Sequence, residues 1–173
     1  IEFATSAPYR AAIARTLGVG SPLRQDRPKP SLFAPAPVSL AVLVAEDTPA
    51  NQKLAVSLLR RRGHTVTVVD NGQDAVREFD EGDFDVVLMD VTMPVMDGYE
   101  ATAAIRQRER NEGRHVPIIA LTAHAAQGTQ ARCKSAGMDA FLPKPIDVAQ
   151  LLELVEGLAN QTAAPTCPKS DPD

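Results

Sequence analysis

The stretch DVVLMDVTMPVMDGYE, residues 85–100, contains an apolar run that ends abruptly on a carboxylate. The run 86–89 is followed directly by Asp90, and a proline and a glycine come within the next eight residues. A continuous rather than alternating apolar run is typical of a strand that is buried on both faces of a parallel sheet. The segment therefore predicts a buried parallel strand with an acidic residue at its carboxyl end.

The same rhythm of apolar strand and amphipathic helix repeats from residue 40 to residue 160. The expected strands are 40–45, 64–69, 84–90, 116–122 and 139–144, and the expected helices are 49–63, 71–82, 98–113, 125–137 and 147–158. In the first helix, Leu54, Leu58 and Leu59 are expected on one face. The alternation predicts an α/β fold, a doubly wound five-stranded parallel sheet with right-handed crossovers and five covering helices. A site is then expected at the carboxyl ends of the strands.

The domain predicted for residues 40–160 has flanking segments of different composition. Residues 20–38 carry five prolines, so residues 1–39 are interpreted as a Pro-rich linker or upstream remnant. Residues 161–173 are expected to form a flexible tail. The net charge of −4 divides into +3 before residue 40, −1 over the tail and −6 over residues 40–160. Since this acidic part has no basic stripe with interleaved aromatics, nucleic acid is not expected as its ligand.

The two cysteines, Cys133 and Cys167, form no CxxC motif and no metal-type cluster with the three histidines. A reduced, cytoplasmic setting is expected, and a single disulfide between them stays an open alternative. No apolar run approaches the roughly 18 residues of a membrane span, and no signal-peptide pattern opens the chain. This segment is therefore expected to make no membrane contact, with any membrane attachment lying outside it.

Polar side chains stand at four of the predicted strand ends: Glu46 and Asp47, Asp90, Thr122, and Lys144. If the first, third, fourth and fifth strands are neighbours, these side chains converge on one edge of the sheet. Two carboxylates about 4 Å apart repel by roughly 4 kcal/mol at an effective dielectric near 20, and one lysine cannot balance three acids. Either one acid is protonated or a hard cation is bound. Ligands that are all oxygen favour Mg²⁺ or a similar ion such as Mn²⁺.

Such a site suits phosphoryl transfer. The metal ion, Lys144 and the Thr122 hydroxyl would each meet one oxygen of the transferred group, and Asp90 would be the nucleophile that forms an acyl phosphate. Taken singly, each residue also has an ordinary explanation as a helix cap, a turn residue or a solvated lysine. Their joint occurrence at the strand ends of one domain is what indicates a site.

Four motifs follow one another in the predicted domain. They are VLVAEDTPANQKLA (42–55), DVVLMDVTMPVMDGYE (85–100), PIIALTAHA (117–125) and GMDAFLPKPI (137–146). Together they resemble the receiver domain of two-component response regulators, and most of all the receiver of hybrid sensor histidine kinases. The resemblance covers residues 40–160 and implies a flavodoxin-like strand order, 2-1-3-4-5.

The resemblance implies a role for each matching acidic position. Asp90 would be the phosphoacceptor, which takes a phosphoryl group from a phosphohistidine. Asp47 would bind Mg²⁺ directly and Glu46 through water, and the backbone carbonyl of Thr92 would complete the protein's share of the metal shell. The chain departs from the hybrid-kinase pattern at Thr48, where an asparagine is frequent, and little effect on the chemistry is expected.

The resemblance also implies a switch. Thr122 and Lys144 would contact the phosphate, Phe141 would be the switch aromatic, and the Lys144–Pro145 bond would be cis. Phosphorylation would draw Thr122 inward, let the Phe141 ring fill the space, and reshape the surface of the fourth helix, fifth strand and fifth helix. For Phe141, plain core packing is an equal alternative.

The implied partners are the phosphotransfer domain of a histidine kinase and a histidine-containing phosphotransfer protein. A stand-alone response regulator is the nearest alternative to a hybrid-kinase parent. A Mg²⁺-dependent phosphohydrolase of the haloacid dehalogenase type is disfavoured, because position 92 is threonine where those enzymes need a second aspartate. A flavodoxin-like FMN site is disfavoured too, since EDTPANQ after the first strand is acidic rather than rich in glycine and serine.

Overall fold

The computed structural model describes residues 36–123 and 127–162, and this part of the chain alternates strands with helices. The strands are β1 (Ala41–Ala45), β2 (Thr65–Val69), β3 (Val86–Asp90), β4 (Ile118–Thr122) and β5 (Ala140–Pro143). The helices are α2 (Pro49–Arg61), α3 (Gly72–Glu81), α4 (Gly98–Glu112), α5 (Gln127–Ala136) and α6 (Val148–Thr162). All ten elements that the sequence predicts are therefore present, and their bounds differ from the predicted ones by a few residues at most.

The five strands form one parallel sheet in the order β2-β1-β3-β4-β5. The predicted fold class and strand order are thereby confirmed. Because all the strand pairs are parallel, the carboxyl ends lie on one edge of the sheet, and the order makes β1, β3, β4 and β5 consecutive there.

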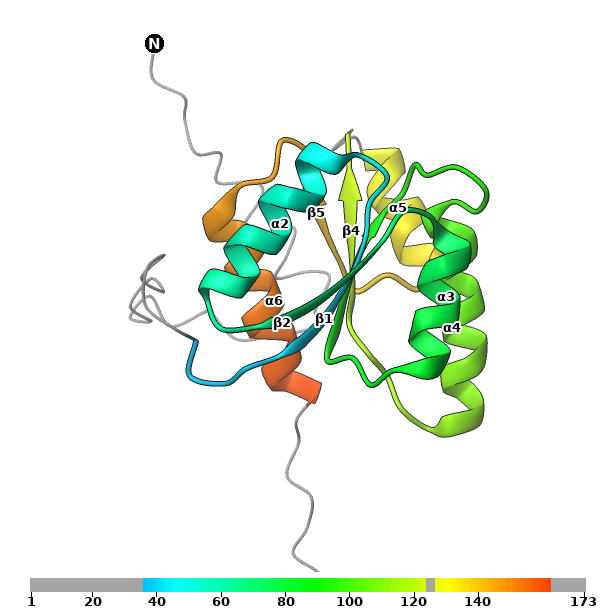
Figure 1. Cartoon of the computed structure of the whole chain (residues 1–173). Coiled ribbons are helices and arrows are strands. Elements are labelled where there is room, and N and C mark those ends of the chain that lie inside the picture. The colour runs from blue at the N-terminus through cyan, green and yellow to red at the C-terminus, as the bar shows by residue number, and fades with distance from the viewer. Residues whose placement is uncertain (1–35, 124–126, 163–173) are drawn as a thin grey trace, which may run out of the picture.

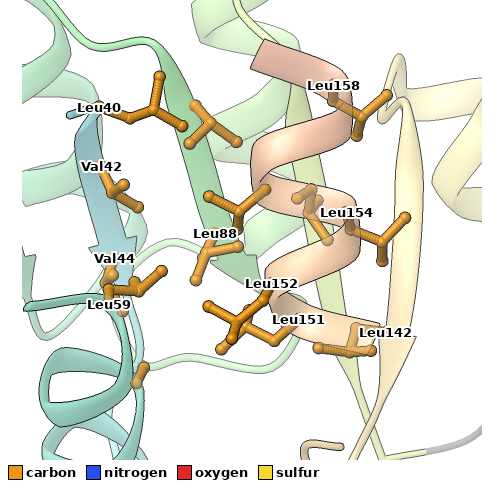
Figure 2. Close-up of a cluster of buried hydrophobic side chains, with 14 of the residues drawn as sticks. Leu40, Val42, Val44, Leu59, Leu88, Leu142, Leu151, Leu152, Leu154 and Leu158 are labelled. Carbon is orange, nitrogen blue, oxygen red and sulfur yellow. The ribbon is translucent and has the colours of Figure 1, made fainter. Parts of the chain in front are cut away.

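Helices cover both faces of the sheet, α2 and α6 on one side and α3, α4 and α5 on the other (Figure 1). Successive strand residues point to opposite faces, so each strand supplies both cores. Val44 and Leu88 belong to the cluster that contains Leu151 and Leu152 of α6, as Figure 2 shows. Their neighbours in sequence belong to the second cluster, with Phe79 of α3 and Ile105 of α4. Burial on both faces is the physical reason for the continuous apolar runs.

The prediction for the first helix was wrong in one detail. In α2 the fully buried side chains are Ala55 and Leu59, whereas Leu54 is 40% exposed and lies outside the buried face. Residues 55 and 59 are four apart and so share one face, which turns Leu54 towards the edge of the helix. The helix is nevertheless held firmly, because Leu59 is part of the core between α2, α6 and the sheet.

Several predictions concern residues outside the described part. Residues 1–35 include most of the predicted linker, 163–173 most of the predicted tail, and 124–126 the predicted start of the fourth helix. Cys133 is a buried free cysteine, and Cys167 lies outside the described residues. The domain boundaries at residues 40 and 160 stay predictions. Over the described ranges, no helix is both long enough and apolar enough to cross a membrane.

Candidate functional site

Three carboxylates meet at the carboxyl edge of the sheet. Glu46 and Asp47 directly follow β1, and Asp90 is the last residue of the neighbouring strand β3. One oxygen of each carboxylate lies within 4.8 Å of the others. Glu46 and Asp90 are buried whereas Asp47 is exposed, so the cluster has two fixed inner members and one outer member that faces solvent.

Lys144 reaches this cluster from the end of β5. Its Nζ lies 2.6 Å from Asp90 Oδ2 and 2.7 Å from Glu46 Oε2, so a single ammonium is shared by two buried carboxylates. The backbone holds Lys144 in place, because its N–H donates to the Thr122 carbonyl at 2.7 Å. The peptide bond that follows, Lys144–Pro145, is cis, as the resemblance implies.

The environment shifts the pKa of both partners upward. Burial raises the pKa of Asp90, against the hydrogen bonds from Lys144 and from the Thr92 N–H that favour the charged form. Burial alone would lower the pKa of Lys144, but the hydrogen bonds to Asp90 and Glu46 outweigh it and the Lys144 pKa is raised. The raised pKa means that burial disfavours the ionised form of Asp90. A cation bound next to Asp90 would favour the ionised carboxylate.

The first turn of α2 holds the acidic pair. Glu46 Oε1 accepts hydrogen bonds from the Thr48 N–H at 3.2 Å and from the Asn51 side-chain amide at 3.0 Å. The Gln52 amide donates to the Glu46 carbonyl at 2.6 Å. The Thr48 hydroxyl donates to Asp47 Oδ1 at 3.2 Å. The residue that departs from the hybrid-kinase pattern thus contacts the predicted metal ligand.

The loop between β3 and α4 folds back against Asp90. The Thr92 N–H donates to Asp90 Oδ1 at 3.1 Å, and Asp97 with Glu100 forms a capping box that starts α4. At Gly98 the backbone passes so close that a Cβ would lie 2.2 Å from the Asp90 carbonyl oxygen. The close contact between the β3–α4 loop and the Asp90 backbone therefore fixes the position of the Asp90 carboxylate.

The remaining predicted site residues are Thr122, Phe141 and Thr92, and their roles stay predictions. Thr122 ends β4 on the same edge and is buried. Phe141 is buried in β5 and lines a pocket of about 270 Å³ formed with α5. Thr92 is placed by its N–H contact, and the role of its carbonyl stays a prediction.

Sequence reasoning missed Asn51, Gln52 and Gly98. Asn51 and Gln52 stand inside the motif that carries the acidic pair, but they lie five and six residues after Glu46, which precedes α2, so the helical spacing of three or four residues does not link them to it. Gly98 is the first residue of α4, directly after the N-cap Asp97, and nothing in the sequence marks its close approach to Asp90.

The donor set fits a hard divalent cation. The cluster offers three carboxylates against one lysine, and all its candidate ligand atoms are oxygens, the type that Mg²⁺ prefers. The exposure of Asp47 leaves one side open for ligands supplied by water. The geometry can therefore place positive charge beside a buried, lysine-bound aspartate.

Comparison with known proteins agrees with this geometry. The family model described as the response regulator receiver domain matches residues 42–156. Over 119 residues the chain is 44% identical to hybrid signal transduction histidine kinase I of Dictyostelium discoideum, covering 66% of this chain and 7% of that protein. The chain therefore spans only a small part of that relative's length.

Two solved structures are similar over most of the described residues. The receiver domain of sensor histidine kinase PA1611 from Pseudomonas aeruginosa PAO1, which has a magnesium ion coordinated in its active-site cleft, is 41% identical with a TM-score of 0.65. That match covers 71% of this chain and 99% of the other. The receiver domain of Saccharomyces cerevisiae Ssk1, crystallised with the histidine phosphotransfer protein Ypd1, is 30% identical with a TM-score of 0.69, covering 73% and 92%. By its family match, its fold and its relatives, this chain belongs to the response regulator receiver domain family.

Proposed function

We propose that Asp90 accepts a phosphoryl group from a phosphohistidine, as one step of a two-component phosphorelay. The observation that carries this proposal is the buried Asp90 carboxylate at the end of β3, which shares one lysine with Glu46. An ordinary cap or turn aspartate is solvated, and it needs neither a lysine at 2.6 Å nor two further carboxylates within 4.8 Å.

The chemistry follows from these contacts. A carboxylate oxygen of Asp90 attacks the phosphorus, a new O–P bond forms, and the P–N bond to the donor imidazole breaks with its electron pair returning to the ring. Lys144, with its raised pKa, stays charged and neutralises the growing negative charge beside Asp90. Mg²⁺ or Mn²⁺, when bound by Glu46, Asp47, Asp90 and the Thr92 carbonyl, supplies further positive charge for the transferred group's oxygens.

The proposal includes a switch at Thr122 and Phe141. Phosphate on Asp90 would attract the Thr122 hydroxyl, and the Phe141 ring would move into the space behind it. Phe141 lines the pocket between β5 and α5, which supports this role, because a moved ring would change the surface formed by α5, β5 and α6. Catalysis by the domain would be limited to its own phosphorylation and dephosphorylation.

The parent protein and partners are also part of the proposal. The relatives suggest a hybrid histidine kinase, with the kinase's phosphotransfer domain and a histidine-containing phosphotransfer protein as partners. A cytoplasmic location fits the buried free thiol of Cys133.

Phosphorylation by acetyl phosphate with Mg²⁺ tests the proposal. The protein should gain the mass of one phosphoryl group, by a linkage that hydroxylamine cleaves, and the gain should disappear in Asp90→Asn and after chelation of the metal. Asp83→Asn is the matched control, because the Asp83 side chain is 99% exposed and lies before β3. A phosphorylated Asp90→Asn variant would disprove the assignment, and multiple turnover of small phosphate esters would favour the phosphohydrolase instead.

A further inference from the structure

The carboxylate of Glu46 is held from two sides. Its residue is only 1% exposed, so both oxygens need partners within the protein. Oε1 accepts from the Thr48 N–H and the Asn51 amide, and Oε2 faces the Lys144 ammonium at 2.7 Å. Oε1 is thus bound by the start of α2, and Oε2 faces Lys144 inside the cluster.

The separate partners of the two Glu46 oxygens fix the orientation of the carboxylate relative to a bound cation. The terminal torsion of a glutamate is broad and roughly two-fold, so without fixed partners the carboxylate plane turns easily. The Asn51 amide is a side-chain donor that holds Oε1 on the helix side. Oε2 is then left facing Lys144, which also binds Asp90.

The main chain of Glu46 is held by the next residue of the same turn. The Gln52 amide nitrogen lies 2.6 Å from the Glu46 carbonyl and 2.6 Å from Asp70 Oδ1, which joins the end of β1 to the residue after β2. The helix that carries both amides is itself anchored in the core by Ala55 and Leu59. The helix that holds Glu46 is therefore itself fixed in position.

We propose that Asn51 is a positioning residue for the metal site, which fixes the Glu46 carboxylate so that one oxygen is directed towards the cation. The inference rests on the proposed function, because it takes Glu46, Asp47 and Asp90 to hold the cation, with Glu46 acting through water. Asn51 itself is not a ligand in this scheme. It acts through Glu46, and Gln52 assists by holding the backbone.

A purely structural role accounts less well for Asn51. The N-cap of α2 is Thr48, and Pro49 occupies the first turn, so Asn51 is not the capping residue. Its side-chain amide instead donates to Glu46 Oε1, which belongs to the acidic cluster outside the helix. A residue that served only to stabilise the helix would leave cation affinity unchanged when it is replaced.

Titration of the whole chain with MgCl₂ by isothermal titration calorimetry tests this role directly. Asn51→Leu keeps a similar size but has no donor, and it should weaken Mg²⁺ binding about tenfold, the change expected for one lost charge-assisted hydrogen bond. Asn51→Gln retains the amide and should restore affinity to within about threefold. Ser57→Ala, an exposed position on the same helix, should bind Mg²⁺ as the unmodified protein does.

A second readout separates positioning from general damage. With acetyl phosphate, the phosphorylation rate of Asn51→Leu should approach that of the unmodified protein at saturating Mg²⁺, since the defect lies in cation affinity. Circular dichroism establishes folding, and Asn51→Ala, which adds no atoms, replaces the leucine variant should that variant not fold. A folded variant without the donor that binds Mg²⁺ within twofold of the unmodified protein would overturn the inference.

Asp47→Ala in the same titration keeps the two proposals apart. Loss of Mg²⁺ binding in Asp47→Ala but not in Asn51→Leu would leave the proposed function standing and remove the role of Asn51. Unchanged binding in Asp47→Ala would show instead that the cation site itself is wrongly assigned, and the inference about Asn51 would fall with it.

Discussion

Gly98→Ala should both destabilise the fold and impair the site. A Cβ at this position would lie 2.2 Å from the Asp90 carbonyl oxygen, 2.9 Å from the Asp90 carbonyl carbon and 2.9 Å from the Val91 Cα. All three are backbone atoms, so no change of rotamer relieves the overlap. Reaching an acceptable 3.0 Å from the oxygen requires about 0.8 Å of backbone movement. We expect a loss of about 3 kcal/mol in unfolding free energy, the upper end for overpacking.

Urea unfolding followed by circular dichroism measures the loss, which corresponds to a fall in Tm of about 12 °C for a domain of this size. Gly157→Ala is the matched control. Position 157 lies inside α6 with nothing within 4 Å of an added Cβ, so alanine there should stabilise the protein by about 0.5–1 kcal/mol.

The same substitution reports on the chemistry. A backbone shift of about 1 Å at Asp90 should slow its phosphorylation by about a hundredfold under conditions in which the variant is folded. If Gly98→Ala unfolds within about 0.5 kcal/mol of the unmodified protein and is phosphorylated normally, the close approach of Gly98 to Asp90 does not constrain the site.

Two further substitutions test local features of the fold. Burial lowers the pKa of His64 below its ordinary value of 6.5, although the nearby Glu156 opposes the shift; the unfolded chain therefore binds more protons than the native state. The stability that His64 contributes should be present above pH 6.5 and be lost as the pH falls through its lowered pKa, so His64→Gln should flatten this dependence in urea unfolding at stepped pH. Val95 is a β-branched residue with a φ of 70° and is 79% exposed. Val95→Asn should raise stability by about 1 kcal/mol in thermal unfolding, because asparagine tolerates the left-handed region and no packing is lost; an unchanged Tm would argue against strain there.

The predictable part of this protein rests on local patterns. Continuous apolar runs identify strands buried on both faces, and the residues that follow them are assigned to the sheet edge by parallel topology alone. That reasoning places Glu46, Asp90 and Lys144 on one edge of the sheet, although Asp90 and Lys144 are 54 positions apart. That they meet there depends on the strand order, which the family resemblance implied and the structure shows. The same reasoning failed at Leu54. Both Leu54 and Ala55 are apolar, and the sequence pattern alone does not say which of these adjacent positions is buried against the sheet.

The sequence by itself determined the elements, the parallel sheet and the edge at which the acids, the hydroxyl and the lysine stand, because these follow from hydrophobic periodicity and chain connectivity. Only the tertiary structure decided that Lys144 is shared between two carboxylates, that Asn51 holds Glu46 Oε1, and that the loop returns at Gly98 against the Asp90 carbonyl. Those features depend on rotamers and on distances of a few tenths of an ångström between segments far apart in the chain. Close packing sets them, and no pattern of residue types records them.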